Sequence, residues 1–346
     1  MLKAQFQWRL TPALAALSAA AATKALGALL IAAVAAASGA PAHAQSDWPK
    51  HEVRIYVGFS AGGTTDIIAR LIGIELSRAW GQPIVIENRA GATGNIAADL
   101  VAKSTPDGYT LLMGSVGPLA VNASLFKSMP FDNLKDLAPV SLVAHVPNML
   151  VLNPKAMPVA TFQEFIAAAK ANPGKYFFAS TGSGTSSHLS GELLRMQAGL
   201  DITHVPYKGA VALNDVLAGD SVHFMFATIP SVIQFVRAGK LRALAVTSPQ
   251  RSAGVPDVPT IAESGFPGFD ASSWFGLVGP AGLPREITAK IAADVARVLK
   301  QHDIREKFIQ QGADPVGSTP EEFGAYMLAE TAKWAKIVKA SGAKVD

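Results

Sequence analysis

The sequence predicts an α/β protein in which strands alternate with helices, and three observations carry this prediction. Short runs rich in β-branched and aromatic residues lie at residues 53–57, 83–87 and 109–113. Between them, residues 64–80 and 95–103 place apolar side chains at helical spacing. The succession of a strand, a small-residue loop and a helix recurs in the second half of the chain. This alternation is typical of a parallel sheet with helices on its faces.

The second half follows the same pattern after a break. Strands are expected at residues 138–144 and 148–152. A helix is predicted at residues 161–172, because Thr161 can serve as its N-cap and Glu164 stands where a capping box requires it. Further strands are expected at residues 176–180, 222–226, 243–247 and 273–278, and further helices at residues 187–198, 286–301 and 320–341.

The N-terminus has the pattern of a secretory signal peptide. Basic residues precede the apolar run at residues 25–37, and Ala42 and Ala44 form a small-residue cleavage site. A membrane anchor is the alternative, but the run is shorter than the roughly 20 residues that a span requires. We therefore predict a signal peptide over residues 1–44, cleaved near Ala44, and a protein secreted across the cytoplasmic membrane.

Composition excludes several classes of function. The formal net charge of +4 falls to about +1 without the leader, which carries three basic residues and no acidic one, so no nucleic-acid partner is expected. The chain has no cysteine, and no histidine pair has metal-ligand spacing. We expect neither a metal nor a cofactor.

The first candidate binding segment is the glycine-bearing loop at residues 59–66. Adjacent glycines at Gly62 and Gly63 let the backbone turn tightly before a helix, which we expect Thr64 or Thr65 to cap. The N–H groups and dipole at such a helix start attract anions. An ordinary strand-to-helix turn is the alternative.

A second loop, at residues 180–187, has similar chemistry. Its glycines and hydroxyls also precede a predicted helix, but Ser187 stands where the third glycine of a dinucleotide-binding fingerprint would be. Two such loops in successive α/β units predict one shared cleft that closes around a ligand.

Isolated residues near strand ends are weaker candidates. Ser115 and Thr228 follow predicted strands, and Tyr207 and Lys208 lie in a turn. Lys208 can be interpreted as a cation for a ligand carboxylate or, more simply, as a surface lysine. Arg89 is better explained by a structural ion pair.

Catalytic interpretations have little support. His188 lies beside Ser186 and Ser187, but neighbours one or two residues apart on a helix do not face each other. Asp66, at a helix start, is better explained by a favourable interaction with the helix dipole than by acid-base work. No Gly-x-Ser-x-Gly nucleophile elbow occurs at the second loop. We therefore expect no catalytic residues.

Seven segments, in this order along the chain, resemble the Bug-type receptors of tripartite tricarboxylate transporters. The match covers essentially the whole chain after the leader. The segments are residues 57–70 (VGFSAGGTTDIIAR), 81–89 (GQPIVIENR), 106–111 (PDGYTL), 180–185 (STGSGT), 205–209 (VPYKG), 241–247 (LRALAVT) and 258–263 (VPTIAE).

The resemblance implies a type II-like periplasmic binding protein fold, in which a ligand cleft separates two α/β domains joined by a two-strand hinge. We expect a discontinuous first domain at residues 45–145 and 269–346, and a second domain at residues 146–268. In the family a ligand carboxylate is held largely by backbone amides and bridging waters. Carried over to this chain, together with the strand-end candidates, the expected ligand-binding residues are Phe59, Ala61, Gly62, Gly63, Thr64, Asp66, Ser115, Ser180, Thr181, Gly184, Thr185, Ser186, Tyr207 and Thr228.

One departure from the family bears on the ligand. The family often has a polar pair such as Asp-Asn where this chain has Ala227 and Thr228. No acid is evident for an ammonium group, which favours non-amino carboxylates. The expected function is capture of a small carboxylate, a di- or tricarboxylate or a related organic acid, by a monomer that delivers it to membrane permease subunits. The alternatives are a sensing subunit for a membrane kinase and, with less support, an enzyme on the same fold.

Overall fold

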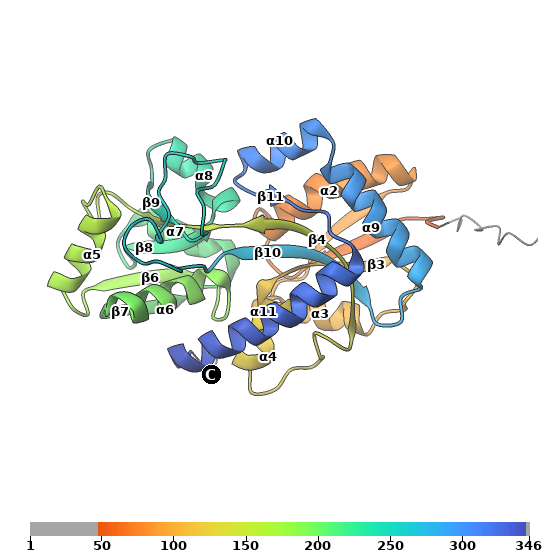
Figure 1. Cartoon of the computed structure of the whole chain (residues 1–346), viewed down its shortest axis with the longest axis horizontal. Helices are drawn as coiled ribbons and strands as arrows, with labels where there is room; N and C mark the ends of the chain where they lie inside the picture. Colours follow the sequence, from red (N-terminus) through yellow and green to blue (C-terminus); the bar gives the residue numbers. More distant parts are fainter. Residues whose placement is uncertain (1–47, 344–346) are drawn as a thin grey trace, which may run out of the picture. The chain divides into compact units, whose positions relative to one another are not determined.

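Two β-sheets organise the chain in the computed structural model, which describes residues 48–343 (Figure 1). The predicted signal peptide lies outside the described residues. The strand order is β11-β4-β10-β3-β1-β2 in the first sheet and β7-β6-β8-β5-β9 in the second. The strands are β1 (Val53–Val57), β2 (Ile84–Asn88), β3 (Thr110–Ser115), β4 (Leu137–Val146), β5 (Asn148–Leu152), β6 (Tyr176–Ser180), β7 (Ile202–Pro206), β8 (Phe224–Thr228), β9 (Arg242–Val246), β10 (Ser273–Pro280) and β11 (Asp314–Pro315).

Helices follow most of the strands. The α-helices are α2 (Thr64–Trp80), α3 (Asn95–Ala102), α4 (Asn122–Leu125), α5 (Phe162–Ala171), α6 (Ser186–Ala198), α7 (Ala212–Ala218), α8 (Ile229–Arg237), α9 (Arg285–Leu299), α10 (His302–Gln310) and α11 (Pro320–Ser341). Short turns of other helix types are η1 (Ala92–Gly94), η2 (Gly117–Val121) and η3 (Gly209–Val211).

The first sheet is held by apolar side chains on both faces. Strand β1 pairs in parallel with β2 and β3, as the β-α-β pattern predicts. On α2, Ile68, Ile72 and Leu76 are buried in one core cluster with Ile55 of β1. This packing fixes the start of α2 directly after the carboxyl end of β1.

Two long strands connect the sheets. Strand β4 ends at Val146, and β5 begins at Asn148 after the single residue Pro147. Strand β10 brings the chain back and pairs with β4 in antiparallel fashion from Ser273 to Pro280. Because one strand leaves the first sheet and the other returns to it, they run in opposite directions. The sheet predicted to be parallel is therefore mixed, and so is the second sheet, where β5 pairs in antiparallel fashion with β8 and β9.

The second sheet has a different helix pair on each face. Leu150 and Leu152 of β5 belong to the core cluster that also contains Phe165 of α5. Met149 and Val151, which alternate with them, belong to the cluster beneath α7 and α8. This alternation is the period of two expected for a strand buried on both sides.

The local predictions succeed where pattern and capping agree. The strands predicted at residues 53–57, 148–152 and 176–180, and the helix predicted at residues 320–341, have the bounds of β1, β5, β6 and α11. Thr161 is the N-cap of α5 and accepts a hydrogen bond from the Glu164 amide at 3.1 Å. Elements α4, α7, α8, α10, β7 and β11 were not predicted.

Contacts join the described residues into one compact unit. The described strands β1–β4, β10 and β11 make one sheet and β5–β9 the other, but the domain boundaries themselves remain a prediction. Within residues 48–343, no helix has both the length and the apolar character needed to cross a bilayer.

Candidate ligand-binding site

A pocket of about 440 Å³ lies where strands from both sheets end. The loop after β1, the end of β3, the loop after β6 and the end of β8 all contribute to its wall. The carboxyl ends of strands are the usual position of ligand sites in α/β proteins. The two glycine-bearing loops therefore meet at one cavity, as the sequence predicts.

Most of the predicted ligand-binding residues line this pocket. Those in its wall are Phe59, Ala61, Gly62, Gly63, Thr64, Ser115, Thr181, Thr185, Ser186 and Thr228. Four others do not contribute to the wall, namely Asp66, Ser180, Gly184 and Tyr207. The first three are adjacent in sequence to lining residues and make hydrogen bonds that fix the loops, and Tyr207 lies two residues before the lining residue Gly209.

The N-terminus of α2 opens into the pocket without a side-chain cap. Its N-cap is Gly63, in an extended conformation (φ −76°, ψ 164°), so the prediction that Thr64 or Thr65 caps this helix is wrong. The first intrahelical bond runs from the Ile67 amide to the Gly63 carbonyl. The amides of the first helical turn, those before Ile67, have no intrahelical acceptor. Thr64 and Thr65 both line the pocket, so this donor-bearing turn adjoins the cavity.

Asp66 stabilises the first loop through hydrogen bonds. Its carboxylate accepts hydrogen bonds from the Gly62 amide, from Arg70 Nε and from Asn88 Nδ2, each at 3.0 Å. Burial raises the pKa of Asp66, but the hydrogen bonds from Arg70, Gly62 and Asn88 outweigh it and hold the pKa below its usual value. The charged carboxylate thus stabilises the left-handed turn at Gly62 (φ +80°), which favours glycine.

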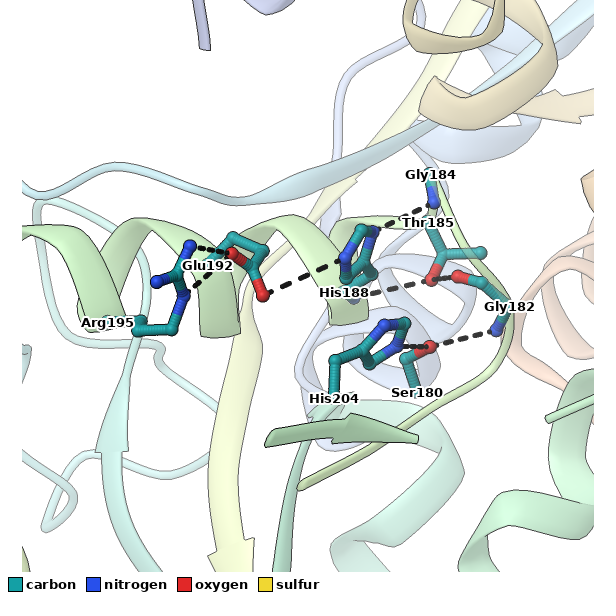
Figure 2. A network of polar contacts seen from close by, with 8 residues as sticks. All are labelled: Ser180, Gly182, Gly184, Thr185, His188, Glu192, Arg195 and His204. Carbon is teal, nitrogen blue, oxygen red and sulfur yellow. Dashed lines mark hydrogen bonds and ion pairs between the residues drawn. The ribbon is translucent and has the colours of Figure 1, made fainter. Parts of the chain in front are cut away.

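The second loop satisfies several of its backbone donors internally. The Gly182 amide donates to Ser180 Oγ at 3.2 Å, and the Thr185 amide donates to the Gly182 carbonyl at 3.2 Å. The Gly184 amide donates to His188 Nδ1 at 3.1 Å (Figure 2). The two loops therefore differ: the helix after the first loop, α2, has no side-chain cap, whereas Thr185 caps α6 after the second loop.

A stacked pair of histidines supports the second loop (Figure 2). The rings of His188 and His204 lie 3.9 Å apart, and His204 Nε2 lies 2.7 Å from Ser180 Oγ. Burial, with a smaller contribution from Arg195, lowers the pKa of His188 to about 4, and burial beside His188 lowers the pKa of His204 to about 3. Both rings are therefore neutral at pH 7, which His188 requires in order to accept from Gly184.

The turn after β7 contributes through its backbone. The Tyr207 hydroxyl donates to Asp215 Oδ2 at 2.6 Å, and this hydrogen bond raises the pKa of Tyr207 to about 12. The Lys208 side chain is exposed and does not line the pocket, whereas the next residue, Gly209, does. Arg89 pairs with Glu87, as the structural interpretation predicts.

Hydrogen bonds join residues of the two sheets around the pocket. Thr64 Oγ1 lies 2.7 Å from Thr228 Oγ1. Thr93 Oγ1 donates to the Ser183 carbonyl at 3.0 Å, and Thr93 has a positive φ of 54°. Because these bonds connect loops from different sheets, they would break if the pocket opened.

The sequence interpretation missed part of the wall. The missed lining residues are Gly209, Ala210, Val211, Leu213, Asn214, Met225, Ser231, Val232, Phe235, Ser273 and Phe275. Ser60 and Thr65 also line the pocket and belong to the first candidate loop, and Val116 and Gly117 follow the same predicted strand as Ser115. Many of the missed residues come from α7 and α8, which were not predicted, and Phe275 faces Ser115 through strand pairing. The amphipathic pattern of the residues that form α8 was the sequence signal that could have identified this helix and its lining residues. No cluster of metal-ligating side chains occurs in the part of the chain that the structure describes.

Comparisons with known proteins agree with this architecture. Residues 68–343 match the family model described as "Tripartite tricarboxylate transporter family receptor". The chain is 40% identical to Protein BugT of Bordetella pertussis over 312 residues, which cover 90% of this chain and 95% of that protein.

Solved structures show the same similarity. "R. palustris Rpa4515 with adipate" is 39% identical with a TM-score of 0.83, covering 86% of this chain and all of the other. MatC (Rpa3494) from Rhodopseudomonas palustris with bound malate is 35% identical with a TM-score of 0.78, covering 84% of this chain and all of the other. The periplasmic binding protein BugD is 32% identical with a TM-score of 0.81, covering 86% of this chain and 99% of the other. The chain belongs to the tripartite tricarboxylate transporter receptor family.

Proposed function

We propose that this protein is a periplasmic receptor that binds a small carboxylate reversibly and delivers it to the permease subunits of a tripartite transporter. The observation that carries the proposal is the uncapped N-terminus of α2 beside a pocket lined from both sheets. Each hydrogen bond from such an amide to a charged acceptor contributes about 1.5–3 kcal/mol, so a few of them hold a carboxylate without a side-chain cation.

The ligands of two solved neighbours support a carboxylate as the ligand of this protein, since one structure contains adipate and the other contains malate. Carried over to this chain, the ligand-binding residues are those predicted ones that line the pocket, with Asp66, Ser180, Gly184 and Tyr207 in supporting positions. We also propose that the domains are divided as predicted, that the protein acts as a monomer, and that cleavage near Ala44 releases it into the periplasm.

Calorimetry with matched acids and amides tests the proposed function. Adipate, malate and hexanoate are compared with adipamide, malamide and hexanamide, after any co-purified ligand has been removed by unfolding and refolding. We expect at least one acid to bind and its amide to bind at least a hundredfold more weakly, because an amide lacks the charge that the α2 amides stabilise. Equal binding of acid and amide would contradict the proposal, and so would chemical conversion of the bound acid.

A further inference from the structure

The pocket has a polar end and an apolar wall. The polar end is formed by the first loop and the start of α2. The wall comes from α7, β8 and α8, which lie together in one half of the molecule (Figure 1). Its apolar side chains are those of Val211, the N-cap of α7, and of Leu213, Met225, Val232 and Phe235. The polar lining side chains of the same elements are Asn214, Thr228 and Ser231. Met225 and Val232 are buried, and Leu213 and Phe235 pack against them in the same hydrophobic cluster.

No charged side chain lines this pocket within residues 48–343. The carboxylate of Asp66 is engaged by Arg70 and Asn88 behind the first loop, and Lys208 is not part of the wall. A charged group at the apolar wall would therefore lose water and gain no cation, so only hydrogen-bond donors could offset the cost of burying it.

Several backbone donors near the apolar wall are also committed. At the start of α8, the Ile229 amide donates to the Pro147 carbonyl, and Pro230 has no N–H group. The Ala210 amide, next to α7, donates to Ser60 Oγ at 3.4 Å. The Ser231 hydroxyl donates to the Thr228 carbonyl at 2.7 Å. In the second loop the Gly182, Gly184 and Thr185 amides are bonded internally, and Thr185 caps α6. Helix α8 has no side-chain cap either, but its first turn leaves only the Ser231 amide, so α2, with the amides of Thr64, Thr65 and Asp66, offers the largest group of first-turn donors.

We propose that the ligand is a carboxylate with one ionised group at the α2 end and an uncharged, apolar body of several carbons against the wall formed by α7, β8 and α8. This inference rests on the proposed function and narrows its ligand class. It distinguishes this pocket from a site for citrate or a short hydroxy-dicarboxylate, in which every part of the ligand requires polar partners.

Hexanoate and adipate provide the sharpest comparison, because they have the same chain length and differ only in a terminal methyl or carboxylate. Their dissociation constants are measured by calorimetry at pH 7.5, together with those of citrate and 3-phenylpropanoate. Of the two monocarboxylates, hexanoate and 3-phenylpropanoate, we expect the one that binds better to bind at least tenfold more tightly than adipate or citrate. Lengthening the aliphatic acid from propanoate to hexanoate should tighten binding about fourfold for each methylene that reaches the wall.

Val211→Lys places a cation at the wall with little risk to folding, since Val211 is 49% exposed. We expect this change to shift the adipate-to-hexanoate affinity ratio at least tenfold in favour of adipate. Val316→Lys is the matched control, because Val316 is similarly exposed (41%) and does not line the pocket. It should leave the ratio unchanged.

The outcomes separate the inference from the proposed function. If adipate or citrate binds within tenfold of the better monocarboxylate, or if Val211→Lys leaves the ratio unchanged in a protein with wild-type circular dichroism, the inference is overturned and the carboxylate receptor stands. If acids and their amides bind equally, the proposed function itself fails.

Discussion

Replacing Gly63 by aspartate tests whether the start of α2 is the anion anchor. Gly63 is the N-cap of this helix and already has the extended backbone that capping residues adopt, so an L-residue fits without a change of conformation. An added Cβ would lie 3.3 Å from the Ser60 carbonyl oxygen, a close contact that requires only a small shift. The new carboxylate would accept from the same first-turn amides that we assign to the ligand.

The substitution should have opposite effects on stability and binding. Relative to Gly63→Ala, which adds the Cβ but no acceptor, Gly63→Asp should raise the free energy of unfolding by about 1 kcal/mol through capping. It should weaken carboxylate binding by roughly 3–6 kcal/mol, which is at least a hundredfold, if two charge-assisted hydrogen bonds are lost. Urea denaturation measures the first quantity and calorimetry measures the second.

Lys208→Ala tests the competing idea that a side-chain cation holds the ligand. Because Lys208 does not line the pocket, its replacement should change the dissociation constant less than about threefold. If Gly63→Asp binds a carboxylate as tightly as Gly63→Ala does, or if Lys208→Ala removes binding, the α2 amides are not the anchor.

Three further perturbations probe the supports of the site. Asp66→Asn should lower the free energy of unfolding by about 2–3 kcal/mol at pH 7, because it weakens the hydrogen bonds to Gly62 and its neighbours. Since the pKa of Asp66 is lowered in the folded protein, this loss of stability, measured by urea denaturation, should become smaller below pH 3.8, the ordinary pKa of an aspartate. A loss that is unchanged at pH 3 contradicts this. Thr228→Val removes the hydrogen bond to Thr64 and should weaken ligand binding about fivefold in calorimetry, with unchanged affinity arguing against a contribution to closure. The pKa of His188 is about 4 in the folded protein and 6.5 in the unfolded chain, so its neutral form stabilises the protein above pH 6.5 and this contribution is lost as the pH falls toward 4. Between pH 7.5 and 4.5 the free energy of unfolding of His188→Asn should therefore fall by roughly 2–3 kcal/mol less than that of the wild type. Equal losses of unfolding free energy would refute this.

The sequence alone determined most of the repeating architecture. Apolar periodicity and capping residues act over a few neighbours, so β1, β5, β6 and α11 could be bounded from the chain itself. The glycines of the two loops likewise marked turns at the carboxyl ends of β1 and β6, one strand from each sheet, and such strand ends are the usual position of ligand sites.

Only the tertiary structure decided how these loops differ. Whether a backbone N–H is free depends on acceptors distant in sequence, such as Pro147, which accepts from Ile229. Whether a pocket wall is apolar depends on which faces of α7 and α8 meet over β8. Local patterns identify a turn that can bind an anion. Which turn keeps amides without an internal acceptor depends on hydrogen bonds to remote segments, and the packing of remote segments determines what surrounds the ligand.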